Sequence, residues 1–354
     1  CQNSIDARAG EHPVVIEFHP FTITKDQIPG QLRIMEEMAS CKNYQKDSQK
    51  TVDALSNMLR EINKNEIQCL RISDFYTKGL IGVSNSEPKP FYLLTKGSGL
   101  TNKVGSSGGS KGIGKYASFV ASLFNTVFYS TYTIENETGY IGICKLCSTT
   151  MPNTEERTQG IGYYGLNEKN EPVLEQLKLD NDFERTIPGT DIYILGFKKE
   201  ETWKKEIITK ILDSFMSAVQ FGDLEVKVDE IVINQENLGA IVDSDEYVLK
   251  NSMNNIKSQY ILLTDPDVYK SNIEIEDYGN ATLYLKGFNK EESYLATNEC
   301  VMIRYPYMKI KSFKNISSIP CSAMCIINDN ALNRVLREIE NPQHTDWEIK
   351  RIED

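Results

Sequence analysis

Residues 108–115 read GGSKGIGK, a run in which four glycines fall within seven residues. Glycine lets the backbone approach a ligand closely, and the helix predicted to begin at Gly114 offers unpaired N–H groups to an anion. Lys111 and Lys115 add positive charge beside those N–H groups. The run therefore predicts a flexible lid that wraps phosphate groups.

Two familiar glycine motifs do not describe this run. In a P-loop a serine or threonine follows the lysine and binds the metal, but Tyr116 stands there, and the glycine spacing differs. A dinucleotide fingerprint follows a strand directly, whereas a long loop rich in Gly, Ser, Pro and Lys, residues 78–112, comes before this run. The phosphates are therefore expected in another kind of nucleotide fold.

Two further segments carry polar side chains suited to a nucleotide. Asn3 and Asp6 are three residues apart on a predicted helix, so they share one face. An Asn amide oxygen suits Mg²⁺, although a helix cap or a surface Asn is the simpler interpretation. Asp74 ends a predicted strand, where its carboxylate could accept a hydrogen bond from the exocyclic amine of adenine; an ordinary strand-end Asp is the alternative.

The order of these segments resembles the GHKL ATPases, which include the DNA gyrase B subunit, the large heat-shock chaperones, histidine kinases and MutL. The segments are residues 2–7 (QNSIDA), 72–74 (ISD) with Gly79 and Leu80, 108–115, and 188–191 (PGTD). The resemblance covers about 190 residues. It implies an α+β fold: a two-layer α/β sandwich (the Bergerat ATP-binding fold) followed by a smaller α/β transducer-like domain.

By this resemblance the chain binds ATP with Mg²⁺. Asn3 would hold the metal, Asp74 would bind adenine, Gly79 and Leu80 would line the base, and Thr190 would reach adenine through water. The full set of implied nucleotide-binding residues is Asn3, Asp6, Ala7, Asp74, Lys78, Gly79, Leu80, Gly109, Ser110, Lys111, Gly112, Ile113, Gly114, Lys115 and Thr190.

Two departures from the family pattern affect this expectation. The loop from Asp74 to Gly79 is one residue longer than in the family and lacks its first glycine. The family's water-activating Glu lies one helical turn before the Asn, a position upstream of Cys1. We therefore expect the natural protein to extend upstream and leave the general base unassigned. This chain is expected to bind nucleotide weakly, hydrolyse it negligibly and stay monomeric or loosely associated.

The chain is predicted to contain two domains, an ATP-binding domain over residues 1–200 and a transducer-like domain over residues 201–354. Such a second domain often sends a lysine to the γ-phosphate, and Arg304, Lys309 and Lys311 are the candidates, with surface solvation as the simpler interpretation of each. Residues 112–119, 128–131 and 340–347 (ENPQHTDW) are similar to MORC-like bacterial ATPases of restriction and anti-phage operons. His344 is expected to be structural or interfacial.

Apolar periodicity predicts the elements along the chain. Strands are expected at 13–24, 67–72, 126–134, 138–148, 161–165, 190–197, 224–234, 280–287 and 299–305, and helices at 27–64, from 114 through Phe124, from about 200 through Phe215, and at 329–340.

Composition limits the classes of function. With 39 basic and 50 acidic residues the net charge is −11, which argues against a sequence-independent DNA clamp. Cys144 and Cys147, with Cys321 and Cys325, suggest zinc ligands, but Cys144 lies in a predicted strand, so free buried thiols are favoured. No apolar run is long enough to span a bilayer and no signal peptide is present, so a cytoplasmic protein without membrane contact is expected.

The expected function is that of a slow ATP hydrolase used as a nucleotide-driven conformational switch in bacterial defence against foreign DNA. The expected partners are ATP, a second copy in an ATP-dependent homodimer, and proteins of a defence operon; direct contact with DNA stays open. Alternatives are a histidine-kinase-like phosphotransfer enzyme, a chaperone-like ATPase and a non-hydrolysing nucleotide-sensing scaffold. The sequence names neither the partner nor the basic residue at the γ-phosphate.

Overall fold

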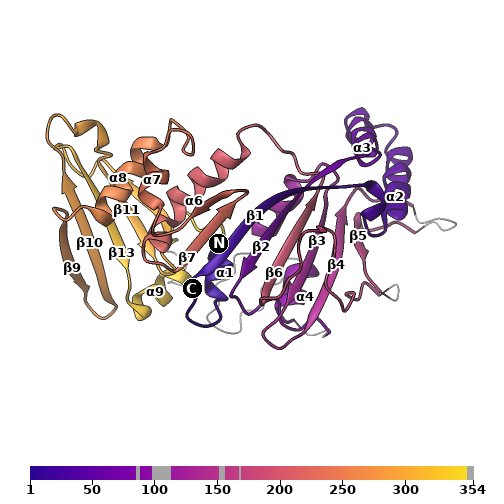
Figure 1. The fold of residues 1–354 in the computed structure, drawn as a ribbon, viewed down its shortest axis with the longest axis horizontal. Helices are drawn as coiled ribbons and strands as arrows, with labels where there is room; N and C mark the ends of the chain where they lie inside the picture. The colour runs from indigo at the N-terminus through magenta and orange to yellow at the C-terminus, as the bar shows by residue number, and fades with distance from the viewer. Residues whose placement is uncertain (85–87, 98–112, 151–155, 167–168, 349–354) are drawn as a thin grey trace. The chain divides into compact units, whose positions relative to one another are not determined.

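A computed structural model describes residues 1–84, 88–97, 113–150, 156–166 and 169–348. The chain forms two compact units. The N-terminal unit contains residues 7–97 and 114–200, and the C-terminal unit contains residues 1–6 and 201–348. Each unit combines a sheet with helices, so the predicted α+β class is confirmed (Figure 1).

The N-terminal unit is built around a sheet in which neighbouring strands run antiparallel, in the order β5-β4-β3-β6-β2-β1. Its strands are β1 Val14–Ile23, β2 Ile67–Phe75, β3 Thr126–Tyr132, β4 Thr138–Lys145, β5 Ile161–Tyr164 and β6 Gly189–Leu195. Its helices are η1 Lys25–Gln27, α2 Gln31–Tyr44, α3 Gln49–Ile62, α4 Pro90–Thr95 and α5 Ile113–Val120.

Alternation along the strands gives this sheet two different faces, because successive side chains point to opposite sides. Face A carries Cys69, Phe128 and Tyr193, which pack in one core with Met38 of α2 and Ile62 of α3. The α2–α3 pair, which Figure 1 shows beside the strands, therefore covers part of face A.

Face B is the opposite side of the same sheet. It carries Val127, Tyr129 and Ile192, which pack with Phe119 of α5 and Leu94 of α4. Helices thus lie on both faces of the sheet. The strand residues that the sequence predicted to bind nucleotide point to one of these two faces.

The C-terminal unit contains a five-stranded sheet in the order β12-β11-β13-β10-β9. Only β11 and β13 run parallel among the pairs of this sheet in the described residues. Its strands are β9 Tyr269–Ile275, β10 Gly279–Gly287, β11 Glu299–Arg304, β12 Met308–Lys314 and β13 Cys321–Ile327. The unit also contains the hairpin of β7 Leu224–Val228 with β8 Ile231–Ile233, and the helices α1 Gln2–Asp6, α6 Trp203–Gln220, α7 Leu238–Asp243, α8 Met253–Thr264, η2 Ser293–Leu295 and α9 Asn330–Glu338.

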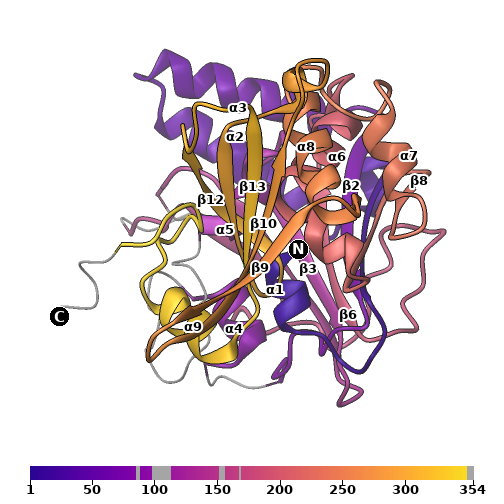
Figure 2. The ribbon, with the colours of Figure 1, turned by 90° about the vertical axis from the view of Figure 1, so that its left-hand side faces the viewer.

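The two faces of this second sheet have separate cores. Leu262 of α8 packs with Met324 and Ile326 on one face. Leu332 of α9 packs with Cys325 and Ile327, on the other face, near one end of the strands (Figure 2). Asp329 caps α9 by accepting hydrogen bonds from the N–H groups of Ala331 and Leu332.

Most predicted elements are present, with three kinds of difference. The expected helix over 27–64 breaks at 45–48 into α2 and α3, and the helix after Gly114 ends at Val120, so that Phe124 enters the core on face A instead. The expected loop over 78–112 contains α4, which begins at Pro90, a residue suited to a first helical turn. Besides α4, the helices α7 and α8, the strands β9, β12 and β13, and the short 3-10 helices η1 and η2 were not predicted, and the strand expected over 224–234 is divided by a turn into β7 and β8.

Candidate functional site

The polar end of face B forms at the point where β2 ends and β6 begins. Asp74 is the second-last residue of β2, and Ser73 beside it faces the opposite side, so Asp74 points to face B. Its Oδ1 accepts a hydrogen bond from the Thr190 N–H at 2.8 Å and from the Thr77 hydroxyl at 2.8 Å. Among the described residues, neither bond uses Oδ2, which leaves that oxygen as an acceptor on a half-buried side chain.

Thr131 of β3 completes this end of face B. Its hydroxyl, which is fully buried, donates to the Gly189 carbonyl at 2.9 Å and accepts from the Leu80 N–H at 2.8 Å. The same side chain therefore connects the start of β6 with the turn that follows β2. Leu80 itself packs against a core of Val83, Phe91 and Ile141, so an apolar wall lies beside the polar group.

Gly79 occupies a position that has no room for a side chain. Its φ is +68°, and a Cβ there would lie 2.6 Å from the Tyr132 carbonyl oxygen and 2.9 Å from the Thr131 hydroxyl. Both the left-handed backbone and the close approach of β3 require glycine. The turn after β2 is thereby held against the end of β3, which fixes where Leu80 lies.

We expect Gly79→Ala to destabilise the protein for two separable reasons. A left-handed backbone costs alanine about 1–2 kcal/mol, and the contact with Tyr132 and Thr131 adds about 1–3 kcal/mol of overpacking. Urea unfolding of the variant measures the sum. Gly10→Ala is the matched control, because Gly10 has φ +85° and nothing within 4 Å of its Cβ position. Equal losses in both variants would contradict the close approach.

The chain start runs beside the same turn. The Ala7 carbonyl accepts from the Lys78 N–H at 2.8 Å, and the Ala9 N–H donates to the Tyr76 carbonyl at 2.8 Å. Lys78 has an exposed side chain. The structure thus brings together six of the predicted site residues within the N-terminal unit: Ala7, Asp74, Lys78, Gly79, Leu80 and Thr190.

The remaining predicted site residues belong to the other unit or to the start of α5, or lie outside the described residues. Asn3 and Asp6 belong to the C-terminal unit, where Asn3 is exposed on α1 and Asp6 pairs with Arg337 at 2.5 Å. Gly109, Ser110, Lys111 and Gly112 fall outside the described residues. Ile113, Gly114 and Lys115 form the beginning of α5, as the sequence predicted for a helix after the glycine run.

A buried arginine on face A supports the main chain of the candidate site, and no pattern in the sequence had indicated it. Arg185 lies in the segment before β6, and its Nη1 donates to the Asp74 carbonyl at 2.9 Å while its Nη2 donates to the Thr190 carbonyl at 3.2 Å. Its Nε and Nη2 also reach the two carboxylate oxygens of Asp191 at 2.7 and 2.5 Å. Arg185 therefore connects the main-chain carbonyls of Asp74 and Thr190, the two residues that are also joined through the Asp74 carboxylate.

Arg185 and Asp191 are both about 2% exposed, so their pairing replaces water almost completely. Burial alone would lower the pKa of Arg185, but the hydrogen bonds and charge of Asp191 outweigh it and raise that pKa above its usual value. The guanidinium stays charged, which the buried carboxylate requires.

The ion pair belongs to a larger network on face A. Asp191 accepts from the Ser73 hydroxyl at 2.6 Å, and Ser73 accepts in turn from Arg71, which also reaches Asp180 at 3.0 Å and Glu17 at 2.7 Å. The Arg71 guanidinium lies 3.5 Å from the centre of the Phe183 ring. These bonds give every nitrogen of both guanidinium groups a protein acceptor.

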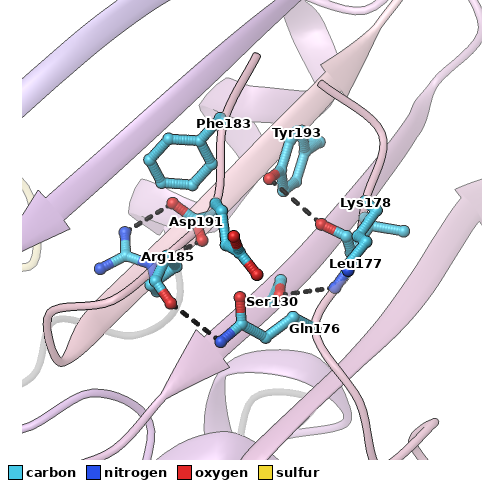
Figure 3. Close-up of a pocket in the computed structure, with 9 residues that line it drawn as sticks. Ser130, Gln176, Leu177, Lys178, Phe183, Arg185, Asp191 and Tyr193 are labelled. Atoms are coloured by element: carbon cyan, nitrogen blue, oxygen red, sulfur yellow. Dashed lines mark hydrogen bonds and ion pairs between the residues drawn. The ribbon is translucent and has the colours of Figure 1, made fainter. Parts of the chain in front are cut away.

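A small hollow next to this network is lined by polar groups that already bond one another. Figure 3 shows Arg185 turned toward Asp191, and the Gln176 amide directed at the Arg185 carbonyl, which it reaches at 2.9 Å. Leu177 donates to the Ser130 hydroxyl and accepts from Tyr193. Because it lies on face A, the hollow is separate from the Asp74 carboxylate, and we assign it a structural role.

The three basic candidates of the C-terminal unit are all paired. Arg304 is 1% exposed and forms a two-point pair with Glu340, at 2.5 and 2.7 Å, so the expectation of a solvated surface residue is wrong for Arg304. Lys309 pairs with Asp213 and Lys311 with Asp346, each at 2.6 Å. Arg304 is the last residue of β11 and its partner lies 36 residues later, so no local pattern in the sequence indicates that Arg304 is buried.

His344, which was expected to be structural or interfacial, lies in a cluster with Glu340 and Arg304. Its Nδ1 contacts the Glu340 carboxylate, which Arg304 also binds. Burial raises the pKa of Glu340, but the hydrogen bonds from His344 and Arg304 together lower it below its usual value. This cluster therefore anchors the segment 340–347 beside the end of β11.

Within the described ranges, no helix has the length and apolar character needed to cross a bilayer. No protein-family model matches this chain, and no curated protein matches it.

Proposed function

We propose that this chain binds ATP through Asp74, with Mg²⁺, and acts as an ATP-hydrolysing conformational switch. The observation that carries the proposal is Oδ2 of Asp74, which neither of the carboxylate's two bonds within the described residues uses. Its Oδ1 is held by Thr190 and Thr77, so that Oδ2 is presented on face B as a fixed, charged acceptor. A fixed acceptor beside an apolar wall is what recognition of an aromatic amine requires.

The chemistry of Asp74 favours adenine over guanine. Adenine carries an exocyclic amine that donates a hydrogen bond to a carboxylate. Guanine has an oxygen at the corresponding position, and this oxygen would repel the Asp74 carboxylate because both groups are acceptors. Leu80, packed against Val83 and Phe91, offers apolar surface for the flat face of a base. We therefore infer that discrimination between bases arises at one carboxylate oxygen.

The metal and the phosphate contacts are part of the same proposal. Asn3, exposed on α1, is the residue we assign to Mg²⁺, and the segment 109–115 is assigned to the phosphates. The resemblance to the GHKL ATPases supports both assignments. It also supports the wider role that we propose, a switch that works with a second copy and with partner proteins in defence against foreign DNA.

The direct test is thermal unfolding with a non-hydrolysable ATP analogue and Mg²⁺. A ligand at 100 times its Kd stabilises a fold by about 2.7 kcal/mol, which moves the melting temperature clearly. We expect this shift with the ATP analogue and a much smaller one with the GTP analogue at the same concentration. Replacing Mg²⁺ by EDTA should reduce the shift, which tests the metal separately.

A scaffold without nucleotide chemistry is the rival explanation of the glycine-rich run. It predicts no shift with either nucleotide at any concentration, and that result would exclude the proposal. Equal shifts with both nucleotides would point instead to recognition through phosphates alone, and would remove the role given to Asp74.

A further inference from the structure

The strand β9 is an edge strand with an unusual degree of exposure. It lies at the end of the five-stranded sheet beside β10, and in the described part of the chain it pairs with no other strand (Figure 1). Six of its seven side chains are exposed, and only Ser271 is half-buried. An edge of this kind presents unpaired N–H and C=O groups that can template another strand.

We propose that β9 pairs antiparallel with β9 of a second copy of this chain, around a two-fold axis at Asn272. The strand reads YKSNIEI over residues 269–275. In that register Lys270 lies opposite Glu274 of the second copy, and Glu274 opposite its Lys270. Opposite charges directly across an antiparallel pair are stabilising, and like charges are destabilising.

The other side of the strand matches in the same register. Tyr269 lies opposite Ile275 of the second copy, and Ser271 lies opposite its Ile273. Tyr269 is 61% exposed and Ile275 39% exposed, so both have apolar surface to bury. A two-fold pairing uses the same patch on both copies, and β9 is complementary to itself in charge, with the apolar pair of Tyr269 and Ile275 formed twice.

No other two-fold register of β9 satisfies both charges. Side chains keep their face only when the axis passes through a residue, because a shift by one residue exchanges the faces. An axis at Lys270 or at Glu274 places like charges opposite each other. An axis at Ser271 shortens the overlap and places Lys270 opposite Asn272, and an axis at Ile273 does the same for Glu274, so in neither register does a charged residue of β9 meet its opposite charge within the strand. The sequence of β9 therefore selects the axis at Asn272.

The sheet beside β9 supports an apolar contact of limited size. Leu285 of β10 lies opposite Tyr269 within the sheet and is exposed on the same face. The far part of this face is covered by Leu332 and Leu336 of α9 and by Trp347, but β9 itself has no such cover in the described residues. One pair of short strands makes a small interface, so we expect a weak, reversible dimer.

The test is sedimentation velocity over a wide range of protein concentration, without nucleotide. The unmodified chain should change from monomer to dimer as concentration rises. Lys270→Glu alone and Glu274→Lys alone each place like charges opposite each other twice, and each should weaken the dimer at least about tenfold. The double variant K270E/E274K restores both opposite pairs and should dimerise like the unmodified chain.

An equimolar mixture of the two single variants gives a second rescue, because a copy with two acidic positions then meets a copy with two basic ones. The mixture should dimerise where each variant alone does not. Lys250→Glu and Glu246→Lys are matched controls that make the same charge changes on exposed residues between α7 and α8. Circular dichroism of every variant checks that the fold is kept.

The proposal is overturned by a chain that stays monomeric at every concentration, by a dimer that the single reversals leave unchanged, or by a mixture that fails to recover association. It does not depend on ATP binding, since no nucleotide is present. The nucleotide titrations and this experiment can therefore fail independently.

Discussion

Asp74→Asn is expected to weaken binding of an ATP analogue about 10- to 100-fold. A hydrogen bond to a charged group contributes about 1.5–3 kcal/mol, and about 1.4 kcal/mol corresponds to a factor of ten in Kd. The Thr190 N–H and the Thr77 hydroxyl both donate, so they hold the amide oxygen of the new side chain in the place of Oδ1. The amide nitrogen then stands where Oδ2 was and opposes the amine of adenine.

The exchange of an acceptor for a donor at the position of Oδ2 also predicts a change of base preference. An amide nitrogen at that position suits the oxygen of guanine, so the ratio of ATP to GTP affinity should fall even if overall binding is weak. Isothermal titration with both analogues measures the ratio. Asp26→Asn is the matched control, because it removes one exposed carboxylate from the same unit. Unchanged affinity in Asp74→Asn, with the fold intact, would exclude Asp74 as the adenine contact.

Arg185→Met is expected to lower the free energy of unfolding by about 3–5 kcal/mol, the cost of leaving one member of a buried ion pair without its partner. Both Arg185 and Asp191 are almost fully buried, so water cannot replace the lost bonds. The double variant R185M/D191N removes both charges and should recover part of the loss. Chemical unfolding of the three proteins measures these differences.

Arg185 should also affect the nucleotide, because it binds the carbonyls of Asp74 and Thr190. Arg71→Met is the matched control. It breaks a neighbouring buried pair with Asp180 and Glu17 but touches neither of those carbonyls. At a temperature well below unfolding, we expect the ATP-to-GTP ratio to fall in the Arg185 variant and to stay the same in the Arg71 variant. A stability loss below about 1 kcal/mol in Arg185→Met would contradict the burial argument.

Local patterns in the sequence were sufficient for most elements of the N-terminal unit. Alternating apolar residues predicted β1 and β4, and the apolar spacing over 27–64 predicted α2 and α3. The short polar motifs also identified residues that come together in space, since Asp74 and Thr190 are joined by a hydrogen bond although they are 116 residues apart. These features were readable because side-chain periodicity and turn chemistry act over a few residues.

The missed elements have patterns that local reading cannot resolve. β13 is buried along its whole length and reads CSAMCII, a continuous small and apolar run without alternation. β9 reads YKSNIEI, in which Ser271 and Asn272 interrupt the alternation, and it lies on an exposed edge where no core selects one face. In both cases the neighbouring strands, rather than the sequence of the segment, stabilise the strand.

The sequence by itself thus determined most elements of the N-terminal unit and the identity of the polar residues that meet at the end of β2. The tertiary structure alone decided that β6 inserts between β2 and β3, and that Arg185 closes the network behind Asp74. It also decided that Arg304 is buried against Glu340. The physical reason is that a buried charge is stable only beside partner groups, and the Asp74 carbonyl for Arg185 and Glu340 for Arg304 are partners that come from far along the chain. Strand order and register, rather than local spacing, decide which distant groups meet.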